Sequence, residues 1–183
     1  MTGLFGGAFD PPHAGHVELA EGAKRHFGLS HLVVLVAAAP GHKDVVLSPE
    51  DRLELARAAF PDEDVRLDGH ARTIELLRDS DWDDPIFLIG ADEFCDFLSW
   101  REPEAVLART RLGVATRPGF PEERLRRVLE RLPSPERVLF FPIEPYEIAS
   151  RDLRARAAAG ESLDGLVPPP VARLIEERRF YRP

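Results

Sequence analysis

The chain has 183 residues, enough for one domain with a full hydrophobic core. It carries 32 acidic residues against 24 Lys and Arg, a formal net charge of −8. This balance argues against broad binding to nucleic acid or anionic membranes, because both need clustered positive charge. The single Cys95 excludes an internal disulfide framework and a cysteine-rich zinc module. No stretch approaches the roughly 20 apolar residues that span a bilayer, and no signal peptide precedes the first apolar run. We therefore expect a soluble, cytoplasmic protein.

Apolar runs of strand length alternate with helical patterns along the chain. The run Leu32–Ala37 is apolar on both faces, as a central strand of a parallel sheet should be. Ser48 and Pro49, followed by two acidic residues, open a helix. In chain order we predict a strand that begins by residue 3, a helix over 17–27, a strand over 32–37, a helix over 48–60, a strand over 65–67, a helix that begins over 73–77, strands over 85–90 and 112–115, a helix over 122–132, a strand over 138–141, and helices over 150–159 and 170–179. This alternation predicts a single α/β domain across residues 1–183, built on a doubly wound parallel sheet with its ligand at the carboxyl ends of the strands.

The turn after the first strand is the most informative part of the chain. Residues 5–16 read FGGAFDPPHAGH, which places two glycines, an Asp-Pro-Pro turn and two histidines before a helix. Such a turn directs backbone N–H groups and the positive end of a helix at an anion. His13 and His16, three residues apart, share a face and can donate hydrogen bonds to phosphate oxygens. The alternatives are an ordinary pair of helix-start histidines or two metal ligands. A metal site lacks an obvious third ligand nearby.

Several polar residues follow the other predicted strands and fall on the same edge of the sheet. His42 and Lys43 follow the second strand, where a solvated basic loop is the alternative. Asp92 follows a buried strand and could face ribose hydroxyls or act as a helix cap. Trp100, taken by itself, is typical of ordinary core packing. Arg117 suits phosphate or carboxylate recognition, or faces solvent in a turn.

These motifs resemble the HxGH nucleotidyltransferase superfamily, and the longer pattern G-G-x-F-D-P-x-H-x-G-H resembles its nicotinate/nicotinamide mononucleotide adenylyltransferase branch. The G-A-D at 90–92, the R-P-G at 117–119 and the I-A-S-R-D-L-R at 148–154 are similar to further motifs of that branch, in the same order. The resemblance covers residues 3–181. It implies a Rossmann-like nucleotidyltransferase fold and transfer of the adenylyl group of ATP to nicotinate mononucleotide, the acceptor.

The resemblance also implies roles for individual residues. The acceptor phosphate would attack the α-phosphorus of ATP in line, with no side-chain nucleophile. Mg²⁺ would arrive with ATP, with no metal site on the protein itself. The partners would be ATP and a pyridine mononucleotide, without nucleic acid or membrane, and a homo-oligomer is compatible. The implied catalytic residues are His13, His16, Lys43 and Arg154; the ATP contacts are Gly6, Gly7, Phe9, Asp10, Gly90, Asp92, Ser150 and Arg151; and the acceptor contacts are Arg72, Thr73, Trp100 and Arg117.

Three departures from the family pattern leave the acceptor open. Ala8 stands where a hydroxyl residue is common, and Arg151 stands in place of a Thr. Residues 69–74, GHARTI, replace a stretch that recognises the nicotinate carboxylate, and Arg72 could reach that carboxylate instead. Nicotinamide mononucleotide or another phosphorylated acceptor is therefore an alternative. A module that binds ATP or a dinucleotide without catalysis is the alternative of a different class.

Overall fold

The computed structural model describes residues 1–41, 44–146 and 148–182. Within these residues six parallel strands form one sheet in the order β3-β2-β1-β4-β5-β6. The strands are β1 (Thr2–Gly7), β2 (His31–Ala37), β3 (Asp64–Asp68), β4 (Ile86–Gly90), β5 (Arg111–Thr116) and β6 (Val138–Pro142). The order reverses between β1 and β4, so the predicted doubly wound Rossmann-like sheet is confirmed.

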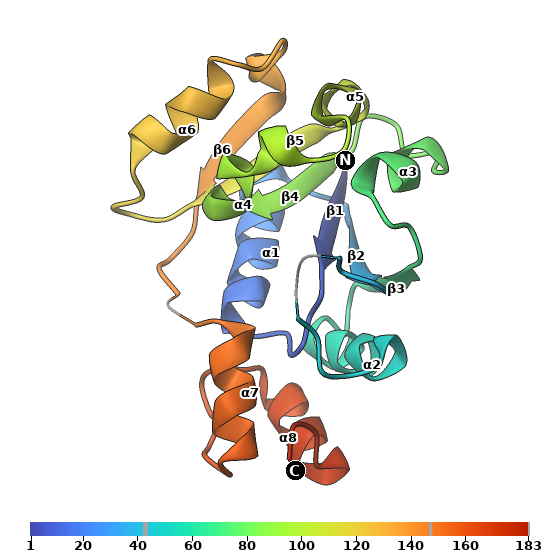
Figure 1. Cartoon of the computed structure of the whole chain (residues 1–183), viewed down its shortest axis with the longest axis vertical. Coiled ribbons are helices and arrows are strands. Elements are labelled where there is room, and N and C mark those ends of the chain that lie inside the picture. Colours follow the sequence, from blue (N-terminus) through green and yellow to red (C-terminus); the bar gives the residue numbers. More distant parts are fainter. Residues whose placement is uncertain (42–43, 147, 183) are drawn as a thin grey trace.

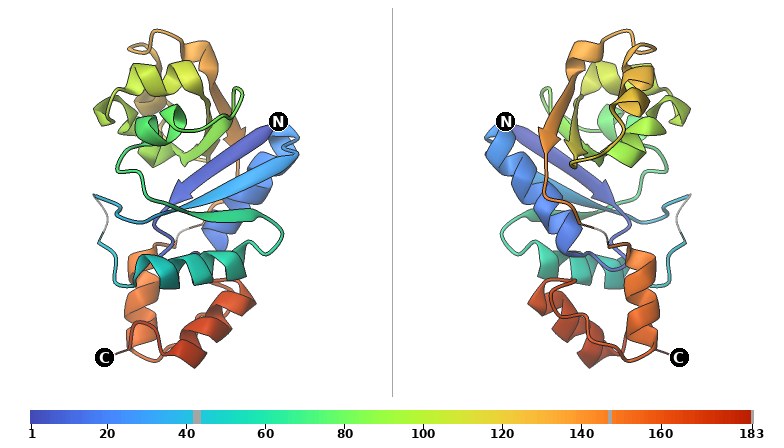
Figure 2. Two further views of the ribbon diagram at one scale, coloured as in Figure 1. Left: turned by 90° about the vertical axis from the view of Figure 1, so that its right-hand side faces the viewer. Right: turned by 90° about the vertical axis from the view of Figure 1, so that its left-hand side faces the viewer.

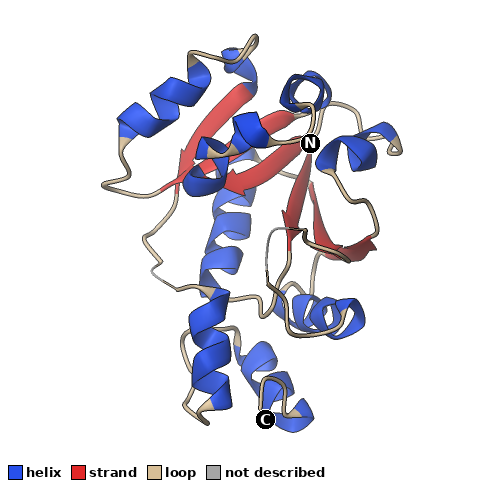
Figure 3. Ribbon diagram, viewed as in Figure 1, coloured by secondary structure: helices blue, strands red, loops and turns tan. Residues whose placement is uncertain are grey.

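Helices cover both faces of the sheet (Figures 1 and 3). Successive residues of a strand point to opposite faces, so Leu4 packs with one helical layer and Phe5 with the other. The layer on the Phe5 side contains α1 (Ala14–Phe27), α2 (Pro49–Ala59), α7 (Ser150–Ala158) and α8 (Pro169–Arg178). The other contains α3 (Thr73–Arg78), α4 (Ala91–Cys95), α5 (Pro103–Arg109) and α6 (Glu122–Leu129).

The last two helices reach back toward the first turn of the chain. Figure 2 shows α7 and α8 together at one end of the long axis, below the carboxyl ends of β1 and β2. β6 is an edge strand of the sheet, whereas the helix α7 that follows it lies below α1 (Figure 1). The start of α7 is hydrogen-bonded to Asp10 and Pro11 in the turn after β1, at the switch point of the sheet.

Most predicted elements are present, with three differences. The first helix begins at Ala14, three residues before the predicted start, because His13 takes the extended backbone of a helix cap. The helix predicted over 122–132 ends at Leu129. The helices α4 and α5 were not predicted, because five and seven residues are too few for a clear helical period.

Candidate active site

The two glycines at the end of β1 make room for a sharp reversal of the chain. A side chain at Gly7 would lie 2.8 Å from the ring of Phe9, and Phe9 itself has a positive φ of 51°. The Phe9 ring is fully buried and packs edge-on against Phe5. Its side chain therefore belongs to the core, and only its backbone is placed to face a nucleotide.

The two signature histidines meet at the start of α1. Their ring centroids lie 3.7 Å apart with an angle of 31° between the planes. His16 Nδ1 accepts the backbone N–H of His13 at 3.1 Å. An accepting Nδ1 belongs to the neutral ring that carries its proton on Nε2. His16 is thus oriented as an Nε2–H donor.

Gly15 lets the His13 ring lie flat against the first turn of the helix. A Cβ at this position would approach His13 Nδ1 to 3.1 Å and the Cβ of Tyr146 to 3.3 Å. Such contacts are tighter than ordinary van der Waals packing, so a larger residue would push the histidine away. This explains in physical terms why glycine separates the two histidines here.

Burial keeps His13 uncharged at neutral pH. Desolvation lowers the pKa of His13 from 6.5 to about 4, because a half-buried ring loses water that would stabilise its cation. Its Nδ1 is buried, and the described residues provide it with no hydrogen-bond partner. A phosphate oxygen bound here would both supply a partner and favour the protonated ring.

The N-terminus of α7 is joined to the same turn by two hydrogen bonds. Ser150 Oγ donates to the carbonyl of Pro11 at 2.9 Å, and the Arg154 guanidinium donates to the carbonyl of Asp10 at 2.8 Å. Ala149, not Ser150, is the helix cap. The structure thus brings Ser150 and Arg154 to the turn that precedes His13, as an anion site made from two helix starts requires.

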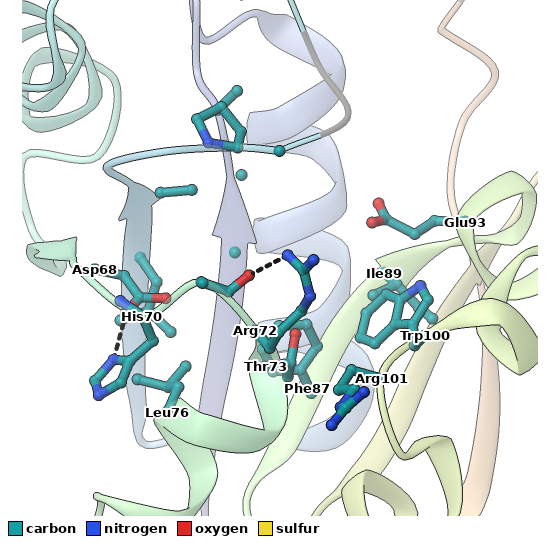
Figure 4. A pocket seen from close by; sticks show the side chains of 18 of the residues that line it. Asp68, His70, Arg72, Thr73, Leu76, Phe87, Ile89, Glu93, Trp100 and Arg101 are labelled. Atoms are coloured by element: carbon teal, nitrogen blue, oxygen red, sulfur yellow. Dashed lines mark hydrogen bonds and ion pairs between the residues drawn. The ribbon is translucent and has the colours of Figure 1, made fainter.

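A cavity of about 780 Å³ opens beside this turn, along the ends of β1 to β4. Its wall includes Gly6 and Gly7, together with the predicted acceptor residues Arg72, Thr73 and Trp100. Figure 4 shows Arg72 projecting into the cavity, with the half-buried Trp100 across from it. The Trp100 indole packs edge-on against Phe87 and Phe97, which fixes its plane.

The loop that carries Arg72 is shaped by a histidine and an aspartate. His70 offers both its backbone N–H and its Nδ1 to Asp68 Oδ1, at 3.0 and 2.7 Å, and its Nε2 faces Asp79 at 3.2 Å. The hydrogen bond to Asp68 is the main reason that the pKa of His70 is raised. The Arg72 guanidinium donates to the carbonyl of Ala71 at 2.8 Å and is otherwise exposed. A cation is therefore held at the wall of the cavity.

The structure places Arg117 apart from the other predicted acceptor residues. Arg117 lines a second hollow of about 860 Å³ between β5, β6 and α6, and it is absent from the wall of the first cavity. Its guanidinium lies 3.3 Å from Asp92 Oδ2. Asp92 lines the first cavity and is mostly exposed. The helix cap before it is Gly90, so Asp92 is not the cap of α4.

Comparison with known proteins supports one family. A sequence profile of the cytidylyltransferase-like family matches residues 4–156. A protein named "probable nicotinate-nucleotide adenylyltransferase" from Symbiobacterium thermophilum is 37% identical over 97% of this chain and 93% of its own length. One of the same name from Rubrobacter xylanophilus is 33% identical over 99% of this chain and 92% of its own length. The chain belongs to the nicotinate-nucleotide adenylyltransferase family.

Solved structures show that the family fold extends over the whole chain. Plasmodium falciparum nicotinic acid mononucleotide adenylyltransferase, solved in complex with NaAD, has a TM-score of 0.75 and is 16% identical, over 98% of this chain and 96% of that one. A putative nicotinate-nucleotide adenylyltransferase from Vibrio parahaemolyticus has a TM-score of 0.68 and 20% identity, over 99% and 94%. The resemblance stated from the sequence is confirmed at the level of family and fold.

One buried cation of this family member was not predicted from the sequence. Arg52 is fully buried and donates to the carbonyls of Ala8, Ala37, Ala38 and Leu47 at 2.7–3.3 Å. Desolvation lowers the pKa of Arg52. These hydrogen bonds connect the turn after β1 to the end of β2. A single Arg within an ordinary amphipathic helix gave no signal of this role.

The remaining predicted site residues are placed as follows. Lys43 lies outside the described residues. Arg151 is exposed on α7, and Gly90 is the last residue of β4. Asp10 is buried, and its side chain is bonded to Val46 and Tyr181. Within residues 1–41, 44–146 and 148–182 there is no group of three His, Cys, Asp or Glu side chains that could hold a metal ion.

Proposed function

We propose that this protein transfers the adenylyl group of ATP to nicotinate mononucleotide, with release of pyrophosphate. The observation that carries the proposal is the pair of adjacent histidine rings at the start of α1, preceded by a turn whose Asp10 and Pro11 carbonyls accept hydrogen bonds from the start of α7. Two converging helix N-termini form a site for a polyphosphate. The cavity of about 780 Å³ beside them has room for the second nucleotide.

The chemistry needs positioning and charge stabilisation more than a reactive side chain. The acceptor phosphate attacks the α-phosphorus in line, the bond from that phosphorus to the bridging oxygen breaks, and pyrophosphate leaves with the electron pair. His16, oriented as an Nε2–H donor, and His13 would contact the α- and β-phosphate oxygens. Ser150, Lys43 and Arg154 would stabilise the charge that gathers on the leaving group.

The proposal also places the adenosine and the magnesium ion of Mg·ATP. Gly6, Gly7 and Gly90 allow the strand ends to approach the nucleotide, and Asp92 would accept hydrogen bonds from the ribose hydroxyls. Mg²⁺ enters with ATP as part of the substrate, bound mainly by phosphates and water. The exposed Arg151 adds a cation near the phosphates.

Acid recognition is assigned to the loop after β3. The pyridine ring would lie against Trp100, and the carboxylate would meet the Arg72 guanidinium at the facing wall, beside Thr73. A charge-assisted pair of this kind favours the acid over the neutral amide. Arg72 is thus the feature that supports nicotinate mononucleotide over nicotinamide mononucleotide.

The experiment is pyrophosphate release from Mg·ATP with nicotinate mononucleotide, with nicotinamide mononucleotide, and with neither, with the dinucleotide product confirmed by mass. Release that depends on the acid supports the proposal. A preference for the amide above tenfold would keep the reaction and change the substrate. Absence of release from folded protein that binds ATP would favour a binding module.

The proposal also covers the domain organisation, location, partners and assembly of the protein. We assign one domain to residues 1–183, a cytoplasmic location, no nucleic-acid partner, and compatibility with a homo-oligomer. The net charge of −8 supports the absence of a nucleic-acid partner. No helix of the described residues is long and apolar enough to cross a membrane.

A further inference from the structure

The segment after α8 contacts the turn after β1, which contains Asp10. This segment lies beyond residues 4–156, the part of the chain that the family profile matches. Tyr181 Oη donates a hydrogen bond of 2.8 Å to Asp10 Oδ1, across 171 residues of sequence. The Tyr181 backbone has a positive φ of 65°. A non-glycine residue keeps this conformation only where its surroundings hold it there. The contact with Asp10 is one such restraint.

Asp10 joins three segments that surround the phosphate side. Its Oδ2 accepts the backbone N–H of Val46 at 2.6 Å, its Oδ1 accepts the Tyr181 hydroxyl, and its carbonyl accepts Arg154. The carboxylate is 1% exposed. A buried carboxylate needs its full set of partners, because losing one leaves charge that neighbouring groups must neutralise.

The hydroxyl of Tyr181 is a donor that stays protonated. Burial, and next the negative charge of Asp10, raise its pKa far above the ordinary range for tyrosine. Among the described residues, Arg154 is a cation already within ion-pair range of this carboxylate: its guanidinium lies 3.8 Å from Asp10 Oδ2, and its side chain is 16% exposed. The buried Arg52 also acts on Asp10 electrostatically but is fixed by four carbonyls. Of the cations in the described part of the chain, Arg154 is thus the one that an under-bonded Asp10 would draw closer.

We propose that Tyr181 is a positioning residue for ATP: by satisfying Asp10, it keeps the Arg154 guanidinium bonded to the Asp10 carbonyl and available to the triphosphate. Asp10 and the triphosphate compete for the same cation, and the Tyr181 hydroxyl decides the competition in favour of the nucleotide. This inference rests on the proposed function only in taking ATP as the ligand of the phosphate side.

The test is Tyr181→Phe, which removes the hydroxyl and keeps the ring. The KM for Mg·ATP should rise about tenfold, the effect of one hydrogen bond to a charged group, and the KM for the acceptor should stay unchanged. Tyr146→Phe is the matched control, because the Tyr146 hydroxyl donates to the Gly165 carbonyl at 3.1 Å, away from Asp10. It should leave both KM values unchanged.

Adding Asp10→Asn to Tyr181→Phe separates this role from simple packing. The amide carries no charge to capture Arg154, so the double variant should recover most of the affinity for ATP. A structural role of Tyr181 alone predicts instead that the second change adds to the damage. The double variant also leaves no unsatisfied carboxylate, so it provides a folded comparison if Tyr181→Phe is unstable.

Two results would overturn the inference. One is a KM for Mg·ATP within about twofold of wild type in Tyr181→Phe, less than the effect of one neutral hydrogen bond. The other is an equal rise for both substrates without recovery on adding Asp10→Asn. If the wild-type protein binds a non-hydrolysable ATP analogue but turns over neither acceptor, the proposed function fails. The same variants, compared by calorimetric Kd for the analogue, then still decide the role of Tyr181.

Discussion

The two sides of the proposed site are built in different ways. The phosphate side comprises the turn and helix start at residues 10–16 with the start of α7, and the acceptor side comprises the loop after β3 with Trp100. On the phosphate side the contacts join residues far apart in sequence: Ser150 to Pro11 across 139 residues, and Arg154 to Asp10 across 144. In the loop that carries Arg72, on the acceptor side, the hydrogen bonds are local: His70 to Asp68 across two residues, Arg72 to Ala71 across one, and His70 to Asp79 across nine. A framework anchored by distant segments fixes the geometry of the reaction. A short loop can change its side chains without disturbing that framework, so substrate choice is separable from chemistry here.

The largest expected effect is on the phosphate side. His16→Ala should lower turnover about 10³-fold, because it removes an oriented donor to the charge that develops on phosphate oxygens. The control is His26→Ala, an exposed histidine in the last turn of the same helix. Circular dichroism should show both variants folded. Near-normal turnover of His16→Ala would exclude this mechanism.

The acceptor side should respond to Arg72→Gln with a smaller and selective loss. The KM for nicotinate mononucleotide should rise about tenfold, the cost of one hydrogen bond to a charged group, while the KM values for ATP and for the amide acceptor stay unchanged. Arg78→Gln provides the control, since Arg78 ends α3 and pairs with Glu102 outside the cavity wall. If the acid and the amide lost affinity equally, Arg72 would not be the carboxylate partner.

The two sides should also differ in how pH affects stability. The pKa of His13 is lowered to about 4 in the folded protein, so between pH 6.5 and 4 the unfolded chain binds more protons and stability falls as pH falls. His13→Gln should remove roughly 1–2 kcal/mol of this loss, since solvent at the half-buried ring screens part of it. Urea unfolding at pH 4.5 and 7 measures the difference.

His70 should show the opposite sign. Its pKa is raised in the folded protein, chiefly by Asp68. It therefore stabilises the fold fully below its unfolded pKa, and this contribution is lost as pH rises through the folded value. His70→Asn should lower stability more at pH 5.5 than at pH 8. The same dependence of stability on pH in both histidine variants would contradict the comparison.

The smallest effect is expected at Arg117, which is absent from the wall of the cavity that contains Arg72 and Trp100. Arg117→Gln breaks an exposed pair with Asp92. It should change the free energy of unfolding by less than about 1 kcal/mol and the acceptor KM by less than about threefold. Thermal unfolding and steady-state kinetics measure the two quantities. A tenfold rise in the acceptor KM would return Arg117 to the acceptor site.

Features encoded by contiguous residues could be predicted from the sequence, whereas features that depend on distant contacts could not. The turn 5–16 and the presence of a helix after it were predicted because strand, glycines and histidines are contiguous, although the helix begins three residues earlier than predicted. The alternation of strands and helices predicted the doubly wound parallel sheet. The acceptor role of Arg117 stays a prediction. Its place after a strand puts it at the edge of the sheet, but the sequence does not say which of the two hollows at that edge it lines. Arg52, and the bonds of Asp10 to Val46 and Tyr181, depend on tertiary contacts that no local pattern reveals.

The position of β1 at the centre of the sheet has a consequence for the order of folding. β1 pairs with β4 through Gly3 and Ile86, and the turn after it is completed by Ser150 and Arg154. Contacts of such long sequence separation form slowly, because loop closure must precede them. The histidines are encoded among the first residues, yet their surroundings are complete only when the last third of the chain has docked. During synthesis and refolding, ATP affinity should therefore emerge late, after most of the secondary structure has formed.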